Sequence, residues 1–241
     1  MQLFAQFSFF KMNTKNITMK TILIICIAFF LGLPSFAQTG FEWPIKELDT
    51  AREVSYLSEA EKDVILELNK VRSNPAKYAQ YSMQWMEVFY SGDLLKIPGK
   101  EVYKTEEGRS AFLECLQALE KAESVQILKP SRGMTKACEL LVYDQSSTGK
   151  TGHKGSGNSS PTDRAFNFGQ FTGYFAENIH YGDCEPAFVV ISLLIDDGVN
   201  SRGHRKNILS NDFNLTGVAI GDHKEYGQMC VNTFATGFTE R

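Results

Sequence analysis

Two apolar segments near the C-terminus, residues 215–222 and 228–236, constrain the fold of this 241-residue chain more than any other feature. The run Lys224-Glu225-Tyr226-Gly227 separates them, and such a run between two β-like segments is typical of a hairpin. An earlier segment, 175–181, alternates apolar and polar residues and predicts a further strand. The chain should therefore contain a small, mostly antiparallel sheet.

Helices are predicted around this sheet from capping residues and apolar spacing. Ser58 with Glu61 is typical of a capping box, and Asn74-Pro75 should end that helix and start another that continues to residue 89. Further helices are predicted over 110–122, 131–148, 161–168 and 187–195, with a surface loop over 92–108. Several helices around one small sheet predict an α/β fold, a three-layer α-β-α sandwich.

The N-terminus has the pattern of a secretory signal peptide. Lys20 follows Met19, an unbroken apolar run covers 22–33, and Ser35-Phe36-Ala37 follows. The run is too short to span a bilayer, so we expect no stable membrane anchor. We expect a signal peptide over residues 1–37 with its start at Met19, a leader segment over 38–56, and a secreted or periplasmic product.

The charge balance argues against a nucleic acid partner. The whole chain has a formal charge of −3, and the expected signal segment removes three lysines and no acid. The remainder is more acidic and carries no cluster of lysine and arginine, which nucleic acid binding requires.

Four cysteines follow the expected cleavage site, and an exported protein meets conditions in which disulfides persist. They are Cys115, Cys138, Cys184 and Cys230. Without a C-x-x-C spacing they do not indicate a structural zinc site. Cys184 closely follows the 175–181 strand and Cys230 lies in the last strand, which predicts a disulfide between them. Cys115 and Cys138 are left unassigned, and buried reduced thiols remain the alternative for at least one pair.

Two histidines and two acids are the candidate chemical groups. His153 and His204 each follow a glycine, whose backbone freedom helps to aim the next side chain. Glu177 lies in an apolar strand, where a carboxylate needs partners. The apolar stripe of the 187–195 helix, continued at helical spacing, arrives at Asp197, and an acid at a helix C-terminus opposes the helix dipole. This conflict indicates either a functional role or a nearby arginine.

Several sequence blocks together resemble the CAP superfamily of cysteine-rich secretory, antigen 5 and pathogenesis-related proteins, also called SCP domains. They are Gly152-His153, 160–164, Glu177-Asn178-Ile179, 200–209 and 217–221, with 69–78 similar to the family's first helix. The resemblance implies a CAP/SCP domain over 57–238, with an insertion at about 83–125. It also implies an α-β-α sandwich with a cleft lined by His153, His204, Glu177 and, as the second acid, Asp197. The helix before His204 lacks the family's usual tryptophan, and aspartate replaces the more typical glutamate.

The resemblance favours a binding or interaction protein with an unknown extracellular ligand or protein partner. Its cleft would hold a divalent metal such as zinc, with His153 and His204 as ligands, or a small or lipid ligand. One alternative is a metal-dependent hydrolase with Glu177 as general base. It has weak support, because His-Glu-x-x-His and Gly-x-Ser-x-Gly are both absent from the sequence. The other alternative is a buried polar network that only fixes the loops.

Overall fold

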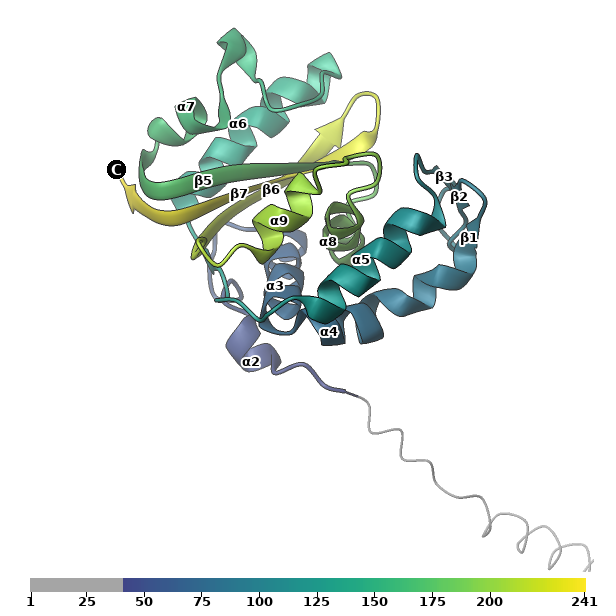
Figure 1. The fold of residues 1–241 in the computed structure, drawn as a ribbon. Coiled ribbons are helices and arrows are strands. Elements are labelled where there is room, and N and C mark those ends of the chain that lie inside the picture. The colour runs from purple at the N-terminus through teal and green to yellow at the C-terminus, as the bar shows by residue number, and fades with distance from the viewer. Residues whose placement is uncertain (1–40) are drawn as a thin grey trace, which may run out of the picture. The chain divides into compact units, whose positions relative to one another are not determined.

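The computed structural model describes residues 41–241 (Figure 1). The expected signal peptide, 1–37, lies outside the described residues, as does the start of the 38–56 leader. The described part of the leader contains helix α2 (Ile45–Leu48), and Leu48 and Ala51 are buried. No helix of the described part is long and apolar enough to cross a membrane.

The main sheet has four strands in the order β4-β6-β7-β5. The central pair is antiparallel and consists of β6 (Leu215–His223) and β7 (Gly227–Glu240), which confirms the predicted hairpin. On the other side of β7 lies β5 (Gly169–Tyr181), also antiparallel to it. The short β4 (Lys129–Pro130) runs parallel to β6. Strand β5 starts well before the predicted residue 175. A shift of register between Thr172 and Phe175 interrupts its alternation, which hid this first part from the sequence pattern.

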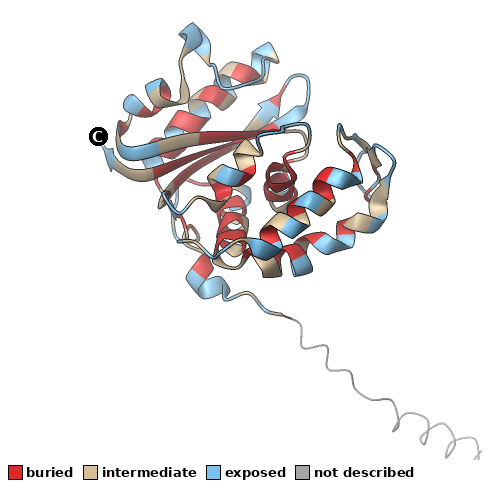
Figure 2. Cartoon of the chain, in the orientation of Figure 1, coloured by how far each residue is buried: buried red, intermediate tan, exposed pale blue. Residues whose placement is uncertain are grey.

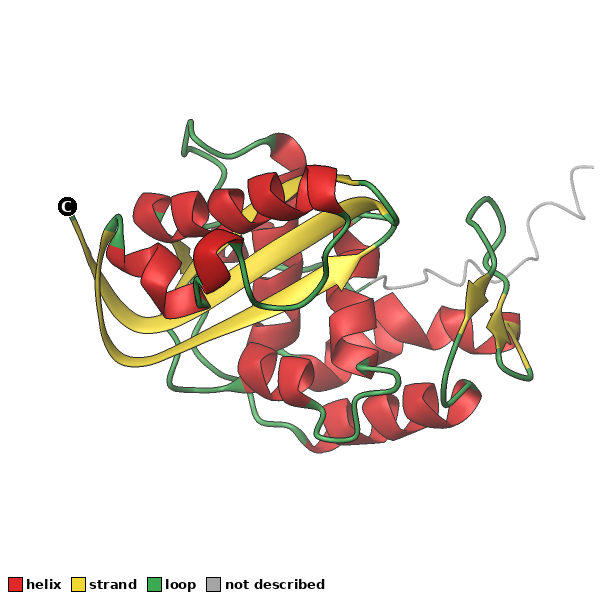
Figure 3. Cartoon of the chain, turned by 90° about the horizontal axis from the view of Figure 1, so that it is seen from above, coloured by secondary structure: helices red, strands yellow, loops and turns green. Residues whose placement is uncertain are grey.

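Helices cover both faces of this sheet (Figures 1 and 3). On one face lie α6 (Arg132–Thr148) and α7 (Pro161–Phe166), and on the other lie α3 (Glu59–Ser73), α8 (Pro186–Ile195) and α9 (Gly203–Leu209). The strands, α3 and α8 form most of the buried interior (Figure 2). The predicted three-layer α-β-α sandwich is therefore confirmed.

The capping residues define most helix ends as predicted. Ser58 and Glu61 form the capping box of α3, and Asn74 ends α3 and caps α4 (Pro75–Tyr78). Helix α6 begins after Ser131 and ends at Gly149, whose positive φ of 68° suits glycine. After α4 the chain continues as a π turn, η1 (Ala79–Met83), and a 3-10 turn, η2 (Gln84–Phe89), where the sequence predicted one uniform helix.

The expected surface loop over 92–108 is partly structured and partly buried. It contributes β2 (Leu94–Leu95) and β3 (Tyr103–Lys104), which with β1 (Tyr90–Ser91) form a small antiparallel sheet. Leu95 and Ile97 are buried in the main apolar core, together with residues of α5 (Arg109–Lys121). The prediction of a loose surface loop was therefore wrong, because these apolar side chains tie the segment to the core.

Candidate functional site: two histidine–carboxylate pairs

The first pair joins His153, in the loop after α6, to Glu177 on β5. The Nδ1 atom of His153 lies 2.9 Å from Oε1 of Glu177. The Glu177 side chain is 1% exposed, whereas that of His153 is 49% exposed. Because an ionised carboxylate only accepts hydrogen bonds, Nδ1 must be the donor, and Nε2 of a neutral ring is then an acceptor. The pair therefore presents an oriented imidazole lone pair at the surface.

Arg164 of α7 completes this pair. Its Nη2 donates to Oε2 of Glu177 at 2.6 Å, and its side chain is 2% exposed. Its Nη1 donates to the backbone oxygens of His153 and Ser159. Both oxygens of Glu177 are therefore engaged. No role was predicted for Arg164, although a carboxylate in an apolar strand indicates the need for a cation.

Three polar side chains hold the loop that carries His153. The backbone N–H of Gly152 donates to Oη of Tyr181 at 2.8 Å, and this hydroxyl donates to Oε1 of Gln145. Nε2 of Gln145 donates to the oxygen of Gly152. His223, which is buried, lies with Nε2 3.0 Å from the oxygen of Lys150. The loop thus has fixed partners on α6, β5 and β6.

The second pair joins His204, at the start of α9, to Asp196, the residue after α8. Nδ1 of His204 lies 2.6 Å from Oδ1 of Asp196, and the backbone N–H of His204 donates to Oδ2 at 2.8 Å. The side chain of Asp196 is 1% exposed and that of His204 is 26% exposed. As in the first pair, the buried carboxylate requires Nδ1 to donate and leaves Nε2 as the acceptor.

Asp197, the expected second acid, does not pair with His204. Its carboxylate accepts hydrogen bonds from the backbone N–H groups of Glu106 and Glu107. The helical spacing used to predict Asp197 does not apply there, because α8 ends at Ile195. Asp196 then adopts a left-handed conformation with φ of 55°. This turn directs Asp196 inward, so the acid of the second pair is Asp196.

The insertion supports the loop of the second pair through ion pairs. Arg202 forms two hydrogen bonds to Glu107, and Arg205 forms two to Glu114 of α5. The side-chain hydrogen bond from Arg202 is the largest cause that lowers the pKa of Glu107 to about 2. Arg205 also donates to the backbone oxygen of Leu194 in α8. The insertion is thus part of the scaffold around His204.

Both histidine loops are attached to adjacent residues of β5. Glu177 binds His153, and the next residue, Asn178, donates through Nδ2 to the backbone oxygen of His204 at 3.1 Å. Asn207 donates to Oδ1 of Asn178. Successive side chains of a strand point to opposite faces, and β5 is an edge strand. The two pairs therefore flank one point on the sheet edge.

A metal centre needs more ligands than these pairs offer together. Within residues 41–241, no group of three or more His, Cys, Asp or Glu side chains is arranged to hold a metal ion. The donor type suits zinc, since an imidazole whose other nitrogen is bound by a carboxylate is common around zinc. The donor number does not suit a resident zinc ion.

The four cysteines of the described region are free and buried. The expected bridge between Cys184 and Cys230 is therefore not formed in this structure. Sγ of Cys184 donates to the backbone oxygen of Gly182. Burial raises the pKa of Cys184 to about 12 and that of Cys115 also to about 12. All four behave as apolar core residues, which is the alternative considered for at least one pair.

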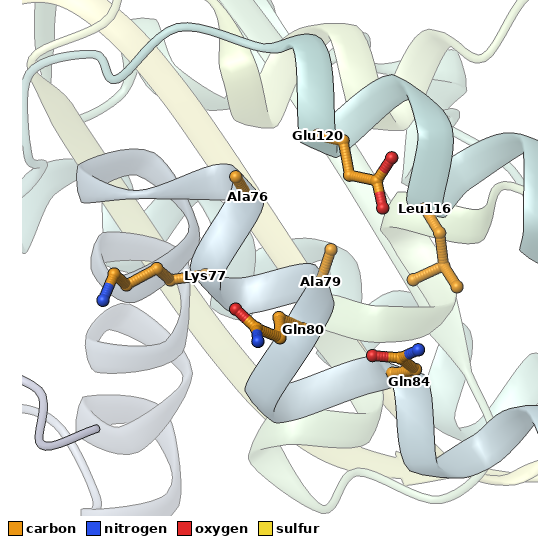
Figure 4. A pocket seen from close by; sticks show the side chains of 7 residues that line it. All are labelled: Ala76, Lys77, Ala79, Gln80, Gln84, Leu116 and Glu120. Carbon is orange, nitrogen blue, oxygen red and sulfur yellow. The ribbon is translucent and has the colours of Figure 1, made fainter. Parts of the chain in front are cut away.

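The candidate residues do not line the hollow beside α5. One hollow of about 330 Å³ lies between the segment 76–84 and α5, where Leu116 and Glu120 face Gln80 and Gln84 (Figure 4). None of the candidate histidines and acids lines it. The candidate site is therefore a surface feature of the sheet edge and not part of this hollow.

The fold and the two pairs define a class of protein: an α-β-α sandwich with two histidines oriented by buried acids. Residues 66–236, more than half of the chain, match the cysteine-rich secretory protein family, CAP. The chain belongs to this family, as its sequence blocks indicated. No curated protein sequence matches the chain.

Two solved structures are similar to the chain. One is an extracellular protein with an SCP domain from Bacillus anthracis, 17% identical, covering 53% of this chain and 39% of that chain, with a TM-score of 0.37. The other is an outer surface protein from Borrelia burgdorferi, 16% identical, covering 53% of this chain and 90% of that chain, with a TM-score of 0.39. This chain thus spans well under two thirds of the Bacillus anthracis protein. We draw no functional conclusion from either similarity.

Proposed function

We propose that this chain is an exported binding protein that holds its ligand through Nε2 of His153 and Nε2 of His204. One observation carries the proposal: both imidazoles are partly exposed, while the carboxylate that orients each is 1% exposed. In many binding sites a carboxylate binds one ring nitrogen of a histidine and fixes the orientation of the ring. The other nitrogen is then accessible to a ligand. Export is supported by the signal-like N-terminal segment of the sequence.

The protonation state of the two rings sets the kind of ligand. In the neutral form of each ring Nε2 carries a lone pair, which favours a divalent cation such as zinc or a ligand rich in hydroxyl or N–H groups. A metal ion bound by the two imidazoles alone would complete its coordination with water or with atoms of the ligand. We therefore take zinc as a probe of the two nitrogens.

The structural alternative also has an observation in its favour. Arg164 and Glu177 are almost fully buried, and Arg164 binds the loop that carries His153, so this group helps to fix the fold. The hydrolase alternative has less support. Glu177 would have to take a proton from water, yet His153 and Arg164 occupy its two oxygens.

Isothermal titration with zinc chloride tests the proposal. We expect zinc to bind the domain of residues 41–241. The double variant His153→Ala/His204→Ala should lose this binding but unfold at a denaturant concentration similar to that of the wild type. The matched control is Lys154→Ala/Lys206→Ala, which changes one exposed lysine next to His153 and one two residues after His204. Equal zinc affinity in the histidine variant and the wild type would refute the proposal. A large loss of stability in that variant would favour the structural alternative.

A further inference from the structure

Two adjoining hollows lie away from the histidine–carboxylate pairs, next to the insertion. The smaller has a volume of about 150 Å³ and the larger about 740 Å³. Tyr103 of β3 and Tyr181 at the end of β5 line both. The hollows therefore meet at these two rings and can be occupied by a single ligand.

The smaller hollow is mainly apolar, and its walls include Leu95, Phe188 and Ile191. Two charged residues also line it: Asp197, whose carboxylate accepts hydrogen bonds from backbone N–H groups, and the exposed Lys104. Oγ of Ser192 lies 2.7 Å from Nδ1 of His180, and Nε2 of His180 lies 3.0 Å from the oxygen of Asp183. An apolar cavity of about 150 Å³ admits a benzene ring. This hollow thus suits an uncharged ring or a short alkyl group.

The larger hollow is acidic and aromatic. Glu101 and Glu225 line it, and their carboxylates have no hydrogen-bond or ion-pair partner among residues 41–241, whereas Asp183 is paired with Lys100 at 2.6 Å. Tyr226, 54% exposed, lies with its ring 5.4 Å from that of Tyr181. Two uncompensated carboxylates beside tyrosine rings attract a cation through charge and through the ring faces.

Two acids of the larger hollow, Asp183 and Glu101, also act on Tyr103, one of the two rings where the hollows meet. The pKa of Tyr103 is raised, first by burial and then by the negative charges of Asp183 and Glu101. The Tyr103 phenol, where the two hollows meet, is therefore neutral and lies in a negative field, which disfavours an anionic ligand.

We propose that the two hollows form one binding site for an organic cation with an apolar group. The apolar group lies in the smaller hollow, and the ammonium group lies in the larger hollow between Tyr226 and the two glutamates. This site is separate from the histidine–carboxylate pairs and does not depend on their function.

Titration calorimetry with benzyltrimethylammonium tests this site, because that probe joins a benzene ring to a quaternary ammonium. We expect it to bind more tightly than tetramethylammonium, which lacks the ring, and than benzyl alcohol, which lacks the charge. The variant Glu101→Gln/Glu225→Gln should weaken binding by about fivefold at low salt. The variant Glu123→Gln/Glu139→Gln removes two exposed charges elsewhere and should bind as the wild type does.

A second pair of variants tests the aromatic contact without risk to the fold, since Tyr226 is exposed. Tyr226→Phe keeps the ring and should retain the affinity, and Tyr226→Leu should weaken it by about twofold to fivefold. Absence of benzyltrimethylammonium binding to the wild type would overturn the proposal. Equal affinity in the two glutamate double variants would also overturn it. Loss of zinc binding by the histidine variant, in contrast, would leave this site unchanged.

Discussion

Arg164 and Glu177 form an ion pair with a 2.6 Å separation inside the domain, where their side chains are 2% and 1% exposed. The pair connects α7 to β5, and the remaining oxygen of Glu177 orients His153. Taking one charge from such a pair leaves the other buried without compensation, which destabilises a protein more than removing both.

Arg164→Met should therefore lower the free energy of unfolding by about 3–5 kcal/mol, measured by urea denaturation. The double variant Arg164→Met/Glu177→Leu should lose less than the single variant, since no unpaired charge remains. If Arg164→Met unfolds at the wild-type urea concentration, the pair does not stabilise the fold.

Asp196 and Asp197 provide a matched comparison for the second pair. Asp196→Asn keeps a side chain that tolerates the left-handed conformation. An amide has only one acceptor oxygen and no charge, so it accepts hydrogen bonds from the two N–H groups of His204 more weakly than the carboxylate does. Zinc affinity should fall about tenfold. Asp197→Asn should leave zinc affinity unchanged, because Asp197 binds only the backbone of the insertion. If Asp197→Asn lowers zinc affinity and Asp196→Asn does not, Asp197 is the acid that orients His204.

Tyr181→Phe removes the hydroxyl that links Gln145 to Gly152. We expect a loss of about 1–2 kcal/mol in the free energy of unfolding and faster amide exchange at Gly152. Tyr174→Phe is the control, since Tyr174 is 66% exposed. Unchanged exchange at Gly152 would mean that the hydroxyl does not hold this loop.

His180 should make stability depend on pH. Burial lowers its pKa to about 4, below the usual value for an unfolded chain. Between these two values the unfolded chain binds more protons, so stability is lost as the pH falls from about 6.5 to 4, by up to about 3 kcal/mol. Denaturation at pH 7 and pH 5 should show a smaller difference for His180→Leu than for the wild type. Equal differences would show that His180 does not contribute.

The four buried cysteines should resist modification in the folded protein. A thiolate is the reactive form, and burial raises the pKa of Cys184 to about 12. A thiol reagent should label all four only after unfolding, and peptide mapping of the exported protein should find no link between Cys184 and Cys230. Detection of that link would instead support the pairing expected from the sequence.

The sequence by itself determined most helix ends and the three-layer architecture. These features are local, because a capping residue such as Ser58 or Asn74 binds backbone groups within a few positions of itself. The run Lys224–Gly227 between two β-like segments likewise defined the C-terminal hairpin without knowledge of its neighbours. His153, His204 and Glu177 were also chosen from the sequence as candidate site residues, and the structure pairs His153 with Glu177.

The tertiary structure alone decided which acid orients His204, which cation neutralises Glu177 and how the insertion contributes. Helical spacing could not identify Asp196, since the left-handed turn at that residue follows from how the chain leaves α8 for α9. Arg164 meets Glu177 only because α7 lies on β5, and the insertion is part of the core only because α5 packs against α8. Each of these contacts joins two different elements of the fold, and their pairing depends on packing that no local pattern encodes.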